Sequence, residues 1–119
     1  MSSITINWGY GLGGAVFDNQ VLSVQLTDAL NFVWGVGFHN MMYKEKDANT
    51  CNRNGGIQLH SYYTNGVSKQ LQLSQSGFEA GKKYCFWCSP HFNMDFELDI
   101  LSTSPSISFP PLAPPNISP

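Results

Sequence analysis

The residues with the clearest chemical potential lie in one short segment, residues 88–94, which reads Cys-Ser-Pro-His-Phe-Asn-Met. Cys88 offers a thiolate, His91 an imidazole nitrogen and Met94 a thioether. Soft sulfur donors together with an imidazole nitrogen suit copper, whereas harder cations prefer oxygen ligands. A mononuclear blue-copper site takes two His and one Cys in a trigonal arrangement with a weak axial Met. The segment therefore supplies all but one His of such a site.

The missing nitrogen ligand must come from one of the two other histidines, His39 and His60. His39 follows a strongly apolar stretch ending at Trp34 and a glycine-containing turn, whereas His60 lies in a polar stretch. We therefore select His39 and interpret His60 as a solvent-facing strand residue. Simpler interpretations stay open, namely a loop histidine for His39 and a core residue for Met94. The predicted metal ligands are His39, Cys88, His91 and Met94.

The two remaining cysteines, Cys51 and Cys85, make an even pair once Cys88 is assigned to the metal. A disulfide between them is the economical interpretation and would imply an oxidising compartment, and two free thiols are the alternative. Cys85 and Cys88 also form a Cys-x-x-Cys pair, which raises zinc or thioredoxin chemistry. The odd spacing directs the two side chains to opposite faces of a strand, and the chain has no second Cys pair and no βαβ pattern.

Strands must position these residues, because period-2 alternation recurs along the chain. The clearest case is residues 94–100, where Met94, Phe96 and Leu98 share one face and acidic residues occupy the other. Similar alternation occurs around residues 4–8, 22–26, 30–34, 71–73 and 84–88, and glycines separate the runs. The pattern predicts one buried and one solvated face per strand. We expect an all-β, Greek-key antiparallel β-sandwich of seven or eight strands, with residues 44–54 undecided between a short helix and a loop.

Composition narrows the function classes. The chain has 119 residues, of which 42% are hydrophobic and only 12% charged, with a net charge of −2. Six scattered Lys and Arg residues argue against nucleic-acid binding. The longest apolar run, residues 30–38, is too short to span a membrane, and we expect no targeting segment in this chain.

The chain changes character after Ser102. Residues 103–119 are rich in Ser and Pro, and they end in the sequon Asn116-Ile117-Ser118 followed by Pro119. We expect a copper-binding domain at residues 1–102 and a Pro/Ser-rich tail or linker at residues 103–119.

Several segments resemble the cupredoxins, the type 1 blue copper proteins, and in the body of the chain their phytocyanin branch. Residues 27–34, Thr-Asp-Ala-Leu-Asn-Phe-Val-Trp, resemble that branch's Gly-Asp-x-Leu-x-Phe-x-Tyr/Trp strand. His39-Asn40 resembles its His-Asn-Val ligand segment, and residues 43–51 resemble the stretch that leads to its first disulfide Cys. The ligand loop differs, since its Cys-Ser-Pro-His spacing is similar to plastocyanins and its short gap to Met94 is similar to amicyanins.

The resemblance implies a non-enzymatic electron carrier whose single type 1 copper cycles between Cu(I) and Cu(II). By the same analogy Asn40 bridges the two ligand loops toward Ser89. Pro90 and Phe92, with glycines of residues 9–14, would form an apolar patch around the edge of His91. There a redox partner protein or a small-molecule electron donor or acceptor would dock. We expect a monomer in an oxidising compartment (secreted, cell surface, periplasm or thylakoid lumen). Two other functions stay open: a copper-free recognition module, as in ephrin ectodomains, and copper buffering or delivery.

Overall fold

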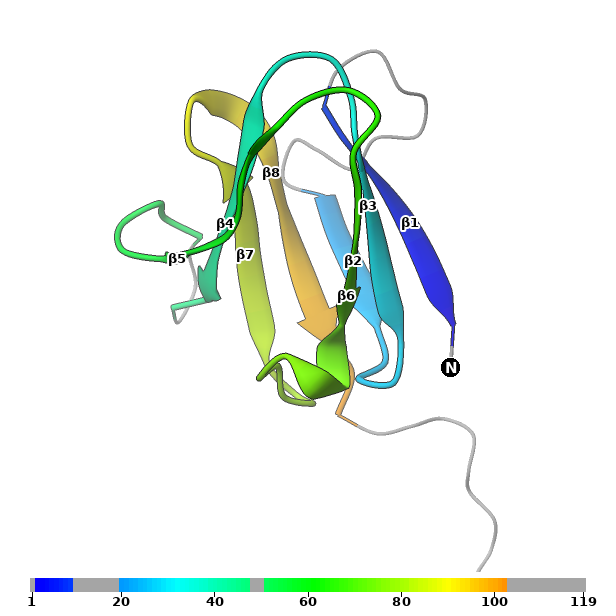
Figure 1. Ribbon diagram of the computed structural model, residues 1–119. Helices are drawn as coiled ribbons and strands as arrows, with labels where there is room; N and C mark the ends of the chain where they lie inside the picture. The colour runs from blue at the N-terminus through cyan, green and yellow to red at the C-terminus, as the bar shows by residue number, and fades with distance from the viewer. Residues whose placement is uncertain (1, 10–19, 48–50, 103–119) are drawn as a thin grey trace, which may run out of the picture.

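A computed structural model describes residues 2–9, 20–47 and 51–102, except for the side chains of Phe92 and Asn93. Within these residues, eight strands form two sheets that face each other (Figure 1). The expected all-β sandwich is confirmed, and residues 44 and 45 continue a strand. The strands are β1 (Ser3–Trp8), β2 (Gln20–Val24), β3 (Ala29–Trp34), β4 (His39–Glu45), β5 (Ile57–Tyr63), β6 (Ser68–Gln72), β7 (Lys83–Cys88) and β8 (His91–Ile100), with one 3-10 turn at Leu73–Gln75.

The pairing of the strands is mixed. One sheet has the order β1-β3-β6 and the other β2-β8-β7-β4-β5. Four pairs are antiparallel as expected, but β1 runs parallel to β3 and β2 parallel to β8. Consecutive strands reverse direction, so two strands that are an even number of steps apart run the same way when they become neighbours. Alternating hydrophobicity reports which face is buried and contains no information on direction.

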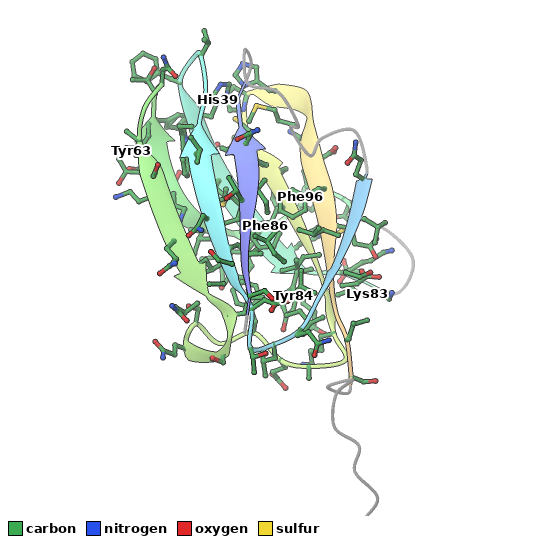
Figure 2. The ribbon with its side chains drawn as sticks, turned by 90° about the vertical axis from the view of Figure 1, so that its right-hand side faces the viewer. His39, Tyr63, Lys83, Tyr84, Phe86 and Phe96 are labelled. Carbon is green, nitrogen blue, oxygen red and sulfur yellow. A yellow bond between two sulfur atoms is a disulfide. The ribbon has the colours of Figure 1, made fainter. Side chains whose placement is uncertain are left out.

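The core lies between the sheets and follows the predicted alternation. Phe86 of β7 stacks on Phe96 of β8 with ring centroids 4.9 Å apart, near the middle of the sandwich (Figure 2). Trp8 meets Phe96 edge to face at 5.9 Å, which joins the two sheets. Burial of each large side chain contributes about 1.5–3 kcal/mol, which makes this layer the main source of stability. Its fully buried members include Ile6, Trp8, Leu30, Phe32, Trp34, Met41, Phe86, Cys88, Met94 and Leu98.

Strand β7 departs from the expectation of one solvated face, because both of its faces are buried. Cys85 and Trp87 on its outer face are only 2% and 4% exposed. Residues 51–56, called here the strap, lie over this face. Gly56 has φ +102°, and a Cβ there would approach the Trp87 ring to 2.6 Å. Trp87 therefore packs on the outer face of β7, under the strap and away from solvent.

Two connections that matter for function lie at the same end of the sandwich. The link between β3 and β4 leads directly into His39, and the turn between β7 and β8 leads from Cys88 to His91 (Figure 1). Strand β7 pairs with both β4 and β8, so it brings the two connections together. The predicted tail at residues 103–119 and its sequon lie outside the described residues.

Candidate metal centre

Three donor atoms converge at this end of the molecule. Cys88 Sγ lies 3.7 Å from His39 Nδ1 and 3.3 Å from His91 Nδ1, and the two Nδ1 atoms are 3.3 Å apart. The centre of such a triangle is about 2.0 Å from each corner, which is close to ordinary metal–nitrogen distances and slightly under metal–sulfur ones. The chemistry and spacing of this donor set therefore fit one transition-metal ion.

His39 is fully buried at the start of β4. Its Nε2–H donates to the carbonyl of Val36, which leaves the Nδ1 lone pair available to a metal. Burial lowers the pKa of His39, and the nearby His91 lowers it further against the opposing effect of the Val36 hydrogen bond. A neutral imidazole with a fixed tautomer is the form that binds a metal.

Two buried tryptophans hold the backbone of this ligand segment. Trp34 Nε1–H donates to the carbonyl of His39 at 2.7 Å, and Trp8 Nε1–H donates to the carbonyl of Asn40 at 2.9 Å. The alternating pattern predicts both tryptophans on buried strand faces, but it does not predict these hydrogen bonds. The one signal in the sequence is that a buried indole N–H needs an acceptor.

Asn40 joins the two ligand loops, as the family analogy implied. Its Oδ1 accepts the backbone N–H of Ser89 at 2.8 Å, and its Nδ2 donates to Ser89 Oγ at 3.1 Å. Nδ2 also lies 3.1 Å from Gln58 Oε1 on β5. Because Asn40 is buried, these bonds fix the position of Ser89 directly after Cys88.

Cys88 ends β7 as a buried free thiol, while Cys51 and Cys85 form the predicted disulfide. Burial raises the pKa of Cys88, and backbone N–H groups of Asn40 and His91 and the positive charge of Arg53 oppose that rise. A buried thiol of this kind loses its proton when a metal takes its place.

Residues 5–100 match the family model of copper binding proteins of the plastocyanin/azurin family. The chain belongs to this family. No curated protein matches the chain significantly. Plastocyanin/azurin-family electron carriers are not enzymes, and the type 1 donor set of this chain is consistent with electron transfer with copper as the cofactor.

The fourth predicted ligand, Met94, is fully buried on the core face of β8. It faces the same side of the larger sheet as Cys88 and belongs to the same apolar cluster. This position suits a residue that serves both the core and the axial side of a type 1 centre. Ligation by its sulfur stays a prediction.

His60 differs from the expected solvent-facing residue. It is half-buried on β5, and its ring packs edge-on against Trp34 at 5.5 Å and Phe32 at 6.4 Å. Its Nε2 is buried and has no hydrogen-bond partner among the described residues. Burial lowers the pKa of His60, and the positive charge of Lys69 lowers it further. The ring therefore belongs to the core edge.

Two features around the site were absent from the sequence interpretation. Arg53, from the strap, donates to the carbonyls of Cys88 and His91 at 2.9 and 2.8 Å. Val36 and Phe38, in the turn before His39, are 57% and 66% exposed.

The apolar patch predicted around His91 is described only in part, and its Pro90 is exposed. The side chain of Phe92 and the glycines at 11, 13 and 14 lie outside the described residues.

Proposed function

We propose that the chain carries single electrons on one type 1 copper held by His39, Cys88, His91 and Met94. The observation that supports this most directly is the convergence of one Sγ and two Nδ1 atoms within 3.7 Å of one another. The bound copper would supply the Cu(I)/Cu(II) couple. The residues of the chain hold the donor atoms in one arrangement for both oxidation states.

Hydrogen bonds around the ligands supply the rigidity that electron transfer requires. The indoles of Trp8 and Trp34 and the side chain of Asn40 fix the backbone on both sides of the site. Hydrogen bonds of this kind around metal ligands set their orientation and limit rearrangement. Little movement between oxidation states keeps the barrier to electron exchange low.

We further propose that electrons enter and leave through His91. Among the three converging ligands it alone is partly exposed, while His39 and Cys88 are fully buried. The exposed apolar side chains of Val36 and Phe38 lie in the turn beside His39 at the same end. Such a surface suits weak, short-lived contacts with a redox protein or a small-molecule donor or acceptor.

Within the family, we propose that this chain resembles the phytocyanin branch. The Asn40–Ser89 bridge and the participation of Cys51 in a disulfide support this branch. The disulfide also indicates an oxidising compartment, and we propose an extracellular or equivalent one. No helix in the described part of the chain is long and apolar enough to cross a membrane.

Reversible redox cycling tests the proposed function. The copper-loaded protein should be bleached by one electron per chain from ascorbate and restored by ferricyanide over repeated cycles, without loss of copper. A copper-delivery protein would release the metal during these cycles. A copper-free recognition module would show no visible absorption band that ascorbate bleaches and ferricyanide restores.

The docking surface is tested with Phe38→Ser, which should slow electron exchange with a protein oxidant while the spectrum and potential stay unchanged. Ile57→Ser is the matched control, because Ile57 is 60% exposed and lies at the opposite end of β5 from the residue that pairs with His39. Equal slowing by both variants would contradict the proposed entry point.

A further inference from the structure

Arg53 makes contacts that extend across the whole ligand turn. Its Nη1 donates to the carbonyl of Cys88 at 2.9 Å and its Nη2 to the carbonyl of His91 at 2.8 Å. Nη2 also lies 3.6 Å from Asp95 Oδ2, next to Met94. One side chain therefore contacts the first and last residues of the turn between β7 and β8 and the residue beyond the predicted axial ligand.

The strap that supplies Arg53 is anchored on both sides of it. Two residues earlier, Cys51 is joined covalently to Cys85 on β7. On either side, Lys44 Nζ donates to Asn52 Oδ1 at 2.6 Å and to the carbonyl of Asn54 at 2.9 Å. Arg53 thus reaches the turn from a segment that is itself fixed to β4 and β7.

The guanidinium group suits this task because it is planar and carries several N–H donors in a rigid fork. When two of these donors bond to the carbonyls at the two ends of the turn, they fix the distance between those ends. That separation sets the backbone positions from which Cys88 Sγ and His91 Nδ1 converge. A lysine ammonium is a single point and cannot hold both carbonyls in the same geometry.

We propose that Arg53 is a positioning residue that holds the ligand turn closed through the carbonyls of Cys88 and His91. The effect of Arg53 on copper rests on the proposed function, whereas its effect on the turn is independent of any metal. The nearby carboxylate of Asp95 offsets much of the positive charge. The hydrogen-bond geometry, and not the charge alone, carries the effect.

The first test uses the metal-free protein and follows hydrogen exchange at the Ser89 amide, which is bonded to Asn40 Oδ1 inside the turn. Arg53→Met and Arg53→Lys should each speed this exchange at least tenfold, while amides in the middle of β7 keep their rates. Lys83→Met is the matched control, because it removes a cation that pairs with Asp99 at 2.8 Å, away from the turn. The control should leave Ser89 unchanged.

The second test uses the copper-loaded protein and measures transfer of copper to a Cu(I) chelator. Both Arg53 variants should release copper at least tenfold faster than the wild type and the Lys83 control. The proposal would be overturned if Ser89 exchange were unchanged in both Arg53 variants, or if Arg53→Lys alone kept the wild-type exchange rate. If Arg53→Met does not fold, the exchange rate of Arg53→Lys still decides for or against the proposal. If Ser89 exchange were faster in the variants but the protein bound no copper, the role of Arg53 in holding the turn would stand and the electron-carrier function would be rejected.

Discussion

At the scale of single residues, the two histidines of the centre have different surroundings. His39 is buried and bonded to Val36, whereas His91 is partly exposed at the end of the turn. The buried histidine has a fixed tautomer and anchors the metal from the core. The exposed one lies where the proposed electron-transfer partner would dock.

Met94 gives a residue-scale prediction for the reduction potential. A thioether is a soft, weak donor that favours Cu(I), whereas an amide oxygen is harder and favours Cu(II). Met94→Gln should therefore keep the colour and lower the potential, and Met94→Leu, which offers no donor, should raise it. Voltammetry of the three proteins measures both shifts. Equal potentials would mean that Met94 is a core residue only.

His60 gives a prediction for pH. Its pKa is lowered from 6.5 in the folded protein, so the unfolded chain binds more protons as the pH falls below about 6.5. The His60 contribution to stability is therefore full above that pH and is lost as the pH falls toward the folded pKa. His60→Phe removes this proton and suits the aromatic surroundings. Thermal unfolding of the metal-free proteins between pH 7.5 and 5 should show a smaller loss in the variant, and parallel curves would contradict this.

At the scale of elements, the Cys51–Cys85 disulfide joins the strap to β7 and spans 34 residues. On the chain-entropy model a loop of this length stabilises the fold by roughly 3–4 kcal/mol. Replacing both cysteines with Ala should lower the free energy of unfolding by about that amount in denaturant titrations. The same variant should also speed Ser89 exchange, because the strap carries Arg53. A loss under about 1 kcal/mol would contradict the chain-entropy estimate for this loop.

The elements differ in how far their sequence predicts them. Strand β8 alternates without interruption, so its core face was predictable. His60 was misplaced because β4 has register shifts around Met41, and such irregularities change how the neighbouring β5 residues face the core. The parallel pairs follow from the order in which the chain crosses between sheets, which alternation does not encode.

The candidate site also contains residues that the sequence predicts and a residue that it does not. Cys88, His91 and Met94 are close in sequence and have distinctive donor types, so their chemistry could be predicted together. Arg53 acts through backbone carbonyls 35 and 38 residues away. Any residue offers a carbonyl, so the sequence contains no motif for such a contact.

At the scale of the whole molecule, the described strands end at Ile100, and the last residue of the family match is residue 100. We predict that a chain ending at Ser102 has the same copper spectrum and the same unfolding midpoint as the full chain. Spectroscopy and thermal unfolding of both forms check this. A lower midpoint in the shorter chain would mean that residues 103–119 contribute to the fold.

The most direct test of the account is a titration of the purified chain with Cu(II), followed by its visible spectrum. An intense blue or green band, arising from charge transfer between the Cys88 thiolate and copper, should grow until one copper is bound per chain. Cys88→Ala should remove the band completely. A band that persists in Cys88→Ala, or a wild-type chain that binds copper without colour, would contradict the assignment of a type 1 centre.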